Sequence, residues 1–592
     1  MDKDIINKKY SVVVVGGGMA GVCTAIASAR SGADTALIQN RPVLGGNASS
    51  EIRMHICGAD YHGKRENARE TGIIEEILLE NRKRNPQYSY SVFDTILWEK
   101  TNFQENLDLY LNTHMTKVFT EKNIIKSIEA EQLTTEKKFL ISGEIFIDST
   151  GDGTLSYLSD ADYMSGREGK EVFGETYAPE KSDDYTMGNT LLFATKDMKE
   201  PVEFEKPEWA NTYTEEDLKN RNHGAHGYNY WWIEVGGEDL DTISDAEEIR
   251  DELLKAVYGV WDHIKNHGDH KADNYALDWV GFLPGKRESR RIKGDYILKE
   301  QDLFAGKRFE DAVAYGGWPM DMHSVGGIRS KVKPTDWIEM DDLYTIPYRS
   351  MYSKNIKNLL LNGRLISVSH MAFGSTRVMA TCSVIGQAVG SAAAMAVKNN
   401  ISVKSISNNI SSLQQKLLKD DIFIPGIKNE DQNDLAKKSK IKVSSTAKGT
   451  TGDNLINGYS RDFNNQNNGW ISDENNQSEE FNEWVELEFD EYIKPEQIQF
   501  KFDSDLSQEI MLTMFKHNLE DQTPGIPSKI VKNYKITAYK DNDIVWEKFV
   551  EDNYLRFKKH RIKEKLLCNK IKVTIFSTNG DKNARIFEIR VY

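Results

Sequence analysis

A glycine-rich turn near the N-terminus constrains the fold of this chain more than any other feature. Residues 16–21 read GGGMAG and follow a β-branched run, Tyr10–Val15. An Ala-rich stretch with a helical pattern comes next at 22–31, and a second strand-like run, Thr35–Gln39, completes a βαβ unit. This order of strand, glycine turn and helix predicts a nucleotide-binding turn rather than a purely structural one.

The glycines and the end of the second strand carry the expected chemistry. Gly16 permits the tight turn, Gly18 lets the backbone approach a pyrophosphate, and Gly21 lets the helix pack closely on the strand. About 20 residues further on, such units have an acidic residue that holds the ribose hydroxyls, whereas this chain has Gln39. An amide can also hydrogen-bond a ribose. Arg41 is a second candidate for this role, and its alternative is a solvated loop charge.

The length, composition and charge of the chain predict a soluble globular protein of several units. It has 592 residues, and since single cores stop growing near roughly 250–300 residues, about three or four units are expected. With 39% hydrophobic and 28% charged residues, the chain can build large cores and is not biased toward disorder. Its net charge of −15 argues against nucleic acid as a partner.

Cysteine usage and the apolar segments exclude further classes. The cysteines are widely spread and form neither a CxxC pair nor a metal-ligand cluster, so neither a disulfide scaffold nor a metal site is predicted. They are Cys23, Cys57, Cys382 and Cys568. The N-terminus lacks a signal-like apolar region, so the chain as written is expected to be cytoplasmic; a signal peptide removed before Met1 would make it periplasmic. The stretch 378–397 is rich in Gly and Ala, which predicts a buried helix and no membrane insertion.

Changes of character along the chain predict a split first domain, an insert and a C-terminal module. Residues 139–148 read as two further short strands of the first domain. Aromatic residues, turn signals and acidic stretches fill the insert, and the strand-like Leu359–Leu361 marks the return of the first domain. The predicted boundaries are 1–163 and 341–427 for the first domain, 164–340 for the insert, 428–444 for a polar linker and 445–592 for the module. In the module, 484–489, 498–502, 534–539 and 571–576 alternate apolar and polar residues, as in an antiparallel sandwich.

A series of motifs carries a resemblance to a known family. The motifs are GGGMAG at 16–21, RPVLGGNASSE at 41–51, IDSTGDGTLS at 147–156 and LLLNGRLISVSHMAFGSTRVMATCSVIGQAVG at 359–390. In order and spacing they resemble the bacterial FAD-dependent oxidoreductases, flavoproteins of the two-dinucleotide-binding-domain, glutathione-reductase-like type. The resemblance implies an α/β Rossmann-like FAD-binding domain, an inserted α+β substrate domain, and FAD as the cofactor.

The resemblance also implies contacts to FAD. In the family, the turn at Gly45-Gly46 lies along the diphosphate and ribityl chain, and the segment 149–151 lies near the adenosine. Asp152 then either hydrogen-bonds nearby or caps the next helix. Gly363-Arg364 replaces the usual Gly-Asp, so Arg364 is a candidate to approach the phosphates.

The last motif contributes the second helix. The turn at 374–377 is expected to start this Gly/Ala-rich helix and to set its N-terminal dipole beside the reduced flavin. Gly386 and Gly390 are expected to pack the helix tightly against its neighbours. The predicted cofactor-contacting residues are Gly16, Gly18, Met19, Ala20, Gly21, Gln39, Asn40, Arg41, Gly45, Gly46, Asn47, Gly151, Asp152, Gly363, Arg364, Ser375, Thr376 and Arg377.

Histidines are the candidate acid–base groups, because a general base near neutral pH is most readily an imidazole. His55 follows the double-glycine turn, His370 precedes the second helix, and His323 lies in the insert. Asp321 is an orienting partner for His323 if folding brings them together. For each histidine the alternative is a structural role. Cys57 has no second cysteine nearby and is interpreted as a packing residue.

The insert offers candidate substrate contacts. Arg287 and Arg290 lie in a basic segment, 284–292, where arginines would bind a carboxylate or polarise a substrate oxygen; a solvated edge strand is the alternative. Aromatic residues offer stacking faces for a sugar or ring, with ordinary strand core as the alternative. They are Tyr228, Tyr230, Trp231 and Trp232.

The C-terminal module resembles galactose-binding-like, discoidin-type sandwiches of jelly-roll fold. The supporting residues are 455–458, 469–470, 484–487 and 584–592. Such modules often bind carbohydrate but can also only pack against an enzyme.

Together these features predict a flavoenzyme that oxidises an alcohol carbon of a carbohydrate or related hydroxylated small molecule by hydride transfer to FAD. One alternative is a flavin-dependent reductase of an unsaturated carboxylate. Another is a glycan-binding or assembly protein whose flavin is structural. The sequence leaves the oligomeric state and the electron acceptor open.

Overall fold

The chain forms two units in the computed structural model, which describes residues 5–223, 233–473 and 481–592. Unit 1 comprises Met1–Tyr61, Gln87–Leu413 and Met511–Asp521. Unit 2 comprises His62–Pro86, Gln414–Ile510 and Gln522–Tyr592. The N-terminal half therefore contributes a short segment, 62–86, to the unit that contains the C-terminal strands.

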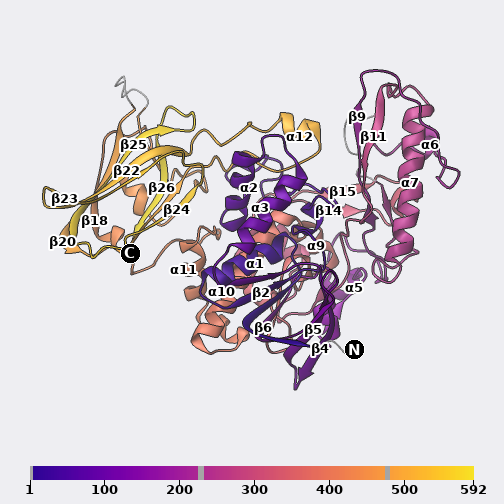
Figure 1. Ribbon diagram of the computed structural model, residues 1–592, viewed down its shortest axis with the longest axis horizontal. Helices are drawn as coiled ribbons and strands as arrows, with labels where there is room; N and C mark the ends of the chain where they lie inside the picture. Colours follow the sequence, from indigo (N-terminus) through magenta and orange to yellow (C-terminus); the bar gives the residue numbers. More distant parts are fainter. Residues whose placement is uncertain (1–4, 224–232, 474–480) are drawn as a thin grey trace. The chain divides into compact units, whose positions relative to one another are not determined.

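Unit 1 contains a seven-stranded sheet, of which β2, β4, β5 and β6 are labelled in Figure 1. Its parallel strands are β1 (Ile6–Val15), β2 (Thr35–Ile38), β3 (Leu107–Tyr110), β6 (Lys137–Asp148) and β17 (Leu359–Leu361), and β4 (Thr113–Glu121) and β5 (Ile124–Gln132) add an antiparallel edge. The strand β1 lies between β2 and β6, and its valines are buried. A strand that is covered on both faces needs apolar residues at successive positions, which explains the continuous apolar run in its sequence. The predicted βαβ unit is confirmed. The two short strands expected at 139–148 are wrong, because that stretch belongs to the single strand β6.

Two helices pack closely against each other beside this sheet (Figure 1): α1 (Met19–Arg30) and α10 (Met379–Asn399). A Cβ atom on Gly386 would lie 2.3 Å from the carbonyl oxygen of Ala20, and one on Gly390 would lie 2.2 Å from that of Thr24. The expected close packing is therefore confirmed. Among the described residues, α10 is the one helix long and apolar enough to span a membrane, and 89% of its most apolar window is buried in the protein, as predicted for a core helix.

The start of this second helix differs from the prediction. Residues 374–376 are not its first turn but the end of a separate helix, α9 (His370–Thr376), and α10 begins at Met379. The Ser369 side chain caps α9 by accepting a hydrogen bond from the backbone N–H of Ala372.

The region 164–340 of unit 1 mixes helices with short antiparallel strand pairs. A helix of 21 residues, α7 (Ala246–Asn266), packs with β9 (Phe193–Asp197) and β11 (Tyr275–Val280) around Trp261 and other buried apolar side chains (Figure 1). The remaining elements of unit 1 are α3 (Tyr90–Asn102), α4 (Thr154–Leu158), α5 (Lys170–Phe173), α6 (Glu215–Leu218), α8 (Glu300–Phe304), α12 (Lys516–Glu520), β7 (Tyr163–Met164), β8 (Asn189–Thr190), β10 (Glu234–Val235), β12 (Arg291–Ile292), β13 (Ala312–Gly316), β14 (Met320–His323), β15 (Thr335–Ile338) and β16 (Tyr344–Pro347).

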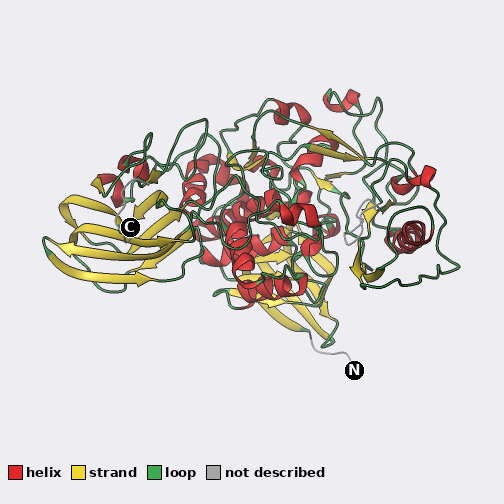
Figure 2. Ribbon diagram, turned by 90° about the horizontal axis from the view of Figure 1, so that it is seen from above, coloured by secondary structure: helices red, strands yellow, loops and turns green. Residues whose placement is uncertain are grey.

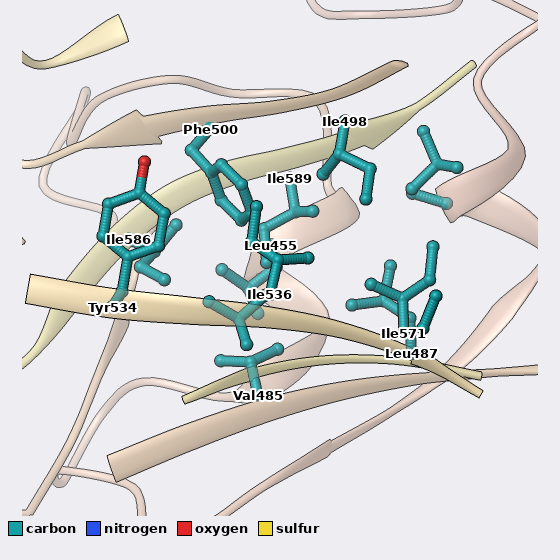
Figure 3. Close-up of a cluster of buried hydrophobic side chains, with 14 of the residues drawn as sticks. Leu455, Val485, Leu487, Ile498, Phe500, Tyr534, Ile536, Ile571, Ile586 and Ile589 are labelled. Atoms are coloured by element: carbon teal, nitrogen blue, oxygen red, sulfur yellow. The ribbon is translucent and has the colours of Figure 1, made fainter. Parts of the chain in front are cut away.

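Unit 2 contains two antiparallel sheets, whose strands are drawn in yellow in Figure 2. The first has the order β18-β20-β25-β22-β23, and the second has the order β19-β26-β21-β24. Apolar side chains from both, among them Val485, Ile536 and Phe500, share one core (Figure 3). The strands are β18 (Ser439–Val443), β19 (Trp470–Ile471), β20 (Glu483–Ile493), β21 (Gln497–Phe502), β22 (Val531–Lys540), β23 (Asp543–Val550), β24 (Phe557–Arg561), β25 (Cys568–Thr578) and β26 (Arg585–Val591).

The four strands predicted in the C-terminal module are confirmed as parts of β20, β21, β22 and β25. The stretch 428–444, expected to be a linker, contains β18, which pairs with β20. Unit 2 also contains the helix α2 (Ile73–Arg84), and α11 (Ile410–Lys419) crosses the boundary between the two sequence ranges.

Candidate cofactor and acid–base site

The glycine turn of unit 1 has the backbone that its sequence predicts. Gly16 has φ +105°, and a Cβ atom there would lie 2.1 Å from the carbonyl oxygen of Ser149. A Cβ atom on Gly21 would lie 1.9 Å from the carbonyl oxygen of Gly16. At Gly18, by contrast, no described atom lies within 4 Å of the Cβ position. Gly16 and Gly21 are therefore required by the protein itself, whereas Gly18 faces open space.

The N-terminus of α1 is suited to an anion. Gly18 is its N-cap, no side chain caps the helix, and its first turn, which contains Met19 and Ala20, has no acidic residue. The second glycine turn lies against this end, because Gly45 donates its N–H to the carbonyl oxygen of Gly17 over 2.8 Å. Open backbone N–H groups beside a cradle without side chains fit the diphosphate of a dinucleotide.

The Gln39 side chain supports the glycine turn. Its Oε1 accepts a hydrogen bond from the N–H of Gly17 over 2.9 Å, and its Nε2 donates to the carbonyl oxygen of Val43 over 3.1 Å. Asn40 is exposed, and Arg41 is half-buried. Contacts of these three residues with a ribose stay a prediction.

Asp152 forms ion pairs and does not cap a helix. Its two carboxylate oxygens lie 2.7 Å from Lys286 Nζ and 3.1 Å from Arg364 Nη2, while the N-cap of α4 is Gly153. Burial raises the pKa of Asp152, but the charges of Arg364 and Lys286 outweigh it and lower the pKa overall. Arg364 also donates to the carbonyl oxygen of Gly151 over 2.8 Å. The capping alternative for Asp152 is wrong, and the approach of Arg364 to phosphates stays a prediction.

The basic segment 284–292 connects these cofactor-motif residues to the insert. The Asn47 side chain donates to the carbonyl oxygen of Lys286 over 3.0 Å. The Ser289 hydroxyl donates to the carbonyl oxygen of Gly151 over 3.1 Å. The segment is therefore held against two of the predicted cofactor motifs rather than lying at a solvated edge.

The same segment brings a carboxylate to His370. Glu288 Oε1 lies 2.8 Å from His370 Nδ1, and its other oxygen accepts the N–H of Met187 over 3.0 Å. The backbone N–H of His370 donates to Glu168. Burial raises the pKa of Glu288, but the charges of His370 and Arg291 outweigh it and keep the carboxylate ionised. In the described part of the chain, Nε2 of His370 has no hydrogen-bond partner.

His323 is held at both ring nitrogens. Nδ1 lies 2.7 Å from Glu234 and Nε2 lies 3.2 Å from Asp321, so the expected pairing with Asp321 is confirmed. Arg287 lies 2.9 Å from Glu234, and Arg377 lies 2.9 Å from Asp321. Burial raises the pKa of Asp321, but His323 and Arg377 outweigh it and lower the pKa overall. These side chains form a buried series in which acidic and basic groups alternate. Both ring nitrogens of His323 are already in contact with carboxylates.

The other predicted catalytic residues contact different groups. His55 packs edge-on against Phe515, with ring centroids 5.4 Å apart. Arg290 donates to the carbonyl oxygen of Asp152 over 3.1 Å and lies 4.1 Å above the ring of Tyr157. Arg290 thus borders the cofactor motifs, whereas His55 does not join either histidine–carboxylate group.

The α9 hydroxyls are buried. Ser375 bonds to the Tyr344 hydroxyl over 2.6 Å and to the carbonyl oxygen of Trp318, so its bonds lie within the protein. The Thr376 hydroxyl is buried and has no partner among the described residues. Gly363 has φ +67°, and a Cβ atom there would approach Ala20 of α1 to 3.3 Å. Gly363 therefore lies beside the first turn of α1, and its contact with FAD stays a prediction.

The remaining candidates are the cysteines and the aromatic residues of the insert. All four cysteines are buried. Cys57 packs with Tyr61, Trp318 and Val378, as expected of a packing residue. Tyr228, Tyr230, Trp231 and Trp232 lie outside the described residues.

Sequence reasoning missed Glu234 and Glu288. Glu288 lies next to Arg287 in the basic segment, but its partner His370 is 82 positions away along the chain. Glu234 is 89 positions from His323. A sequence shows no pairing at such separations. The available signal for Glu288 was a lone acid between basic residues, which is typical of a buried ion pair.

The mixed α/β sheet and the glycine cradle are consistent with the fold of an FAD-binding protein. A model of the family described as FAD dependent oxidoreductase matches residues 11–417, so the chain belongs to that family. The protein is accordingly an FAD-dependent oxidoreductase with FAD as its cofactor.

Comparison with solved structures gives matches to small binding modules. A Streptococcus pneumoniae fucose binding module, SpX-3, is 14% identical, with a TM-score of 0.21, and the match covers 27% of this chain and 97% of that one. A family 32 carbohydrate-binding module from C. perfringens NanJ, solved with galactose, is 16% identical, with a TM-score of 0.19, and the match covers 26% and 94%. Similarities at this level carry no conclusion about a ligand. No curated protein matches the chain.

Proposed function

We propose that this enzyme oxidises an alcohol carbon of a carbohydrate or related hydroxylated small molecule, with His370 as the base that accepts the hydroxyl proton. FAD, when bound, supplies the hydride acceptor for such a reaction. The observation that carries the proposal is the buried Glu288–His370 pair, whose segment is bonded to the cofactor motifs.

Glu288 sets the imidazole for this task. In the neutral tautomer that would act as the base, the carboxylate at Nδ1 holds the proton on that nitrogen, which leaves the lone pair on Nε2. The ionised carboxylate also stabilises the imidazolium that forms when Nε2 takes up a proton. The backbone bond from His370 to Glu168 fixes the start of α9 and hence the ring.

His323 is a weaker candidate for the base. Carboxylates lie against both of its ring nitrogens, so proton uptake from a substrate would first require one of these contacts to break. Its place between Glu234 and Asp321 instead favours a positioning role that holds Arg287 and Arg377.

The arginines argue against the reductase alternative. Such an enzyme needs an arginine fork for the substrate carboxylate. Arg287 is buried and paired with Glu234, and Arg291 is paired with Glu168. Arg290 bonds a backbone carbonyl and stacks on a tyrosine. Because these side chains are engaged by the protein, alcohol oxidation is the better supported reaction.

The carbohydrate class rests on the sequence resemblance of residues 445–592 to galactose-binding-like modules. A hydroxyl-rich substrate also suits a site whose free nitrogen is a hydrogen-bond acceptor. Oxygen, a quinone or another protein would then reoxidise the flavin.

The decisive experiment is anaerobic flavin bleaching of the FAD-loaded protein with a panel of sugars, glycosides and hydroxy acids. A bleaching substrate is expected among them, and His370→Gln should slow flavin reduction by about 10²–10⁴-fold, the usual contribution of a general base. His114→Gln, an exposed histidine on β4, is the matched control and should keep the full rate.

The outcomes separate the three alternatives. An unchanged rate of flavin bleaching in His370→Gln would remove this residue as the base. Oxidation of the reduced flavin by unsaturated acids, without bleaching by any alcohol, would favour the reductase. Glycan binding without any flavin turnover would favour a structural flavin.

A further inference from the structure

Three histidines and a glutamate of unit 1 converge in the insert, apart from the site above. Glu215 begins α6, His223 lies in the loop after it, His263 is in the last turn of α7, and His270 follows that helix. One ligand atom from each of the four lies within 4.8 Å of all the others. The prediction of no metal site rested on the spread of the cysteines. This cluster instead joins two separate stretches of the chain, with Glu215 and His263 48 positions apart.

The ring nitrogens face a common point. Glu215 oxygens lie 3.2 Å from His223 Nε2, 3.0 Å from His263 Nε2 and 3.6 Å from His270 Nε2. The Nε2 atoms of His263 and His270 are 3.2 Å apart. The three ring centroids are separated by 5.2, 5.0 and 5.0 Å, which is nearly an equilateral triangle.

Local structure fixes these positions. Thr214 and Asp217 form a capping box at the start of α6, which holds Glu215 in its first turn. Gly268, with φ +85°, turns the chain back after α7, and a Cβ atom there would lie 3.0 Å from the His270 ring. The turn therefore requires glycine in order to place His270 against His263.

The second ring nitrogen of His223 is held by the backbone. Its Nδ1 lies 2.7 Å from the carbonyl oxygen of Arg221, which orients Nε2 toward the Glu215 oxygen 3.2 Å away. A cation at the point between these atoms gives all four groups a shared partner. Such a backbone bond at the second nitrogen is also the usual support of a metal-ligating histidine.

We propose that Glu215, His223, His263 and His270 form a Zn²⁺ site. Three imidazole nitrogens and one carboxylate oxygen are ligands that zinc takes in tetrahedral sites. The three histidine side chains are only 8%, 4% and 12% exposed, whereas Glu215 is 68% exposed, so the metal enters from the carboxylate side.

Four protein ligands close the site and make it structural. The metal joins the loop after α6 to the end of α7, next to the buried core around Trp261. Its binding free energy then adds to the stability of the insert, because the unfolded chain has no such site. The site is independent of the flavin chemistry proposed above.

The test uses full-length protein purified without a histidine tag. Metal analysis should find one zinc per chain, and the chelator-treated protein should bind Zn²⁺ or Co²⁺ at one site, with the visible bands of tetrahedral Co²⁺. His263→Gln should weaken binding by more than the ~10–100-fold that loss of an outer partner costs. His267→Gln is the matched control, because His267 ends the same helix but pairs with Asp262 at 3.2 Å.

A second variant guards against misfolding. Glu215→Gln changes an exposed side chain, so it should fold normally, bind Zn²⁺ more weakly and alter the Co²⁺ spectrum. Equal Zn²⁺ affinity in the parent, His263→Gln and Glu215→Gln would overturn the proposal. Tight binding of Ni²⁺ or Cu²⁺ without binding of Zn²⁺ would overturn the choice of metal. Neither Zn²⁺ binding nor the Co²⁺ spectrum depends on flavin turnover. The proposed zinc site can therefore fail while the proposed function holds, and the reverse.

Discussion

Gly18 and Gly21 belong to the same turn, yet an added methyl group would meet different surroundings at each. At Gly18, φ is −64°, which any residue adopts, and nothing lies within 4 Å of the Cβ position. At Gly21, the Cβ atom would lie 1.9 Å from a backbone oxygen. Gly21 is therefore needed by the fold, whereas the need for glycine at position 18 stays a prediction about the cofactor.

We predict that Gly18→Ala weakens FAD binding without destabilising the apoprotein. Its stability should change by less than about 0.5 kcal/mol, while a methyl group in the space of the diphosphate should cost about 1–3 kcal/mol of binding, or roughly 5–150-fold in Kd. Gly21→Ala should destabilise the apoprotein itself by about 1–3 kcal/mol or more. Apoprotein melting and FAD fluorescence quenching measure the two effects. A large loss of stability in Gly18→Ala would contradict this division.

His560 predicts a pH dependence of unit 2. Burial lowers the pKa of His560 from 6.5 to about 3, and its Nε2 pairs with the Tyr534 hydroxyl at 2.8 Å. Because the unfolded chain takes up this proton near pH 6.5 and the folded chain does not, stability falls as the pH falls from 6.5 toward 3. Between pH 7 and pH 5 this amounts to about 2 kcal/mol of the free energy of unfolding.

The variant His560→Gln isolates this contribution. It keeps a hydrogen-bonding side chain but removes the titration, so its free energy of unfolding should change less than that of the parent between the two pH values. Urea unfolding of the full-length parent and variant at pH 7 and pH 5 checks this. The same pH dependence in both proteins would show that other groups cause it.

The candidate site was predictable only where its chemistry is local in sequence. The roles of the glycines follow from one hexapeptide, and His323 and Asp321 lie on one short strand. The Glu288–His370 pair and the histidine cluster required chain folding over long separations. The same holds for Asp152, whose partners Lys286 and Arg364 decided between the two roles left open.

At the scale of elements, the α1–α10 contact depends on two glycines. Alanine is better than glycine in an isolated helix by about 1 kcal/mol, so Gly390→Ala would stabilise α10 if packing did not matter. A Cβ atom at this position would instead lie 2.2 Å from the carbonyl oxygen of Thr24. We predict a net destabilisation of about 1–3 kcal/mol, seen as a lower melting temperature. Lys398→Ala, at the exposed end of α10, is the control and should melt like the parent.

Two of the element predictions that failed have identifiable physical causes. Ser142-Gly143 looks like a turn, but Gly143 lies inside β6, where a Cβ atom would come within 2.8 Å of Val13. Glycine is there because the packing is close, and not because the chain turns. In the other case, Ser369 caps a short helix that the longer Gly/Ala pattern concealed.

At the scale of the whole molecule, unit 2 draws on three stretches of sequence. Arg556 is fully buried, and its Nε lies 3.1 Å from Asp421 and 3.6 Å from Glu75. Arg461 is also fully buried and donates to the carbonyl oxygens of Asn67 and Arg69. No pattern in the strands signals that the segment 62–86 supplies Glu75 and the carbonyls of Asn67 and Arg69. The sequence therefore places the boundary of the module at 445, although the unit is larger.

We therefore predict that a fragment 445–592 does not fold stably by itself. It lacks Glu75, Asp421 and the carbonyls that serve Arg461, and a buried charge without its partner costs about 3–5 kcal/mol. A fragment 414–592 regains Asp421 and should be more stable, and added peptide 62–86 should raise its melting temperature further. Circular dichroism melts of both fragments, with the peptide or a shuffled peptide of the same composition, measure this order. Equal, cooperative melting of 445–592 and 414–592, unaffected by the peptide, would mean that the buried arginines do not need these partners.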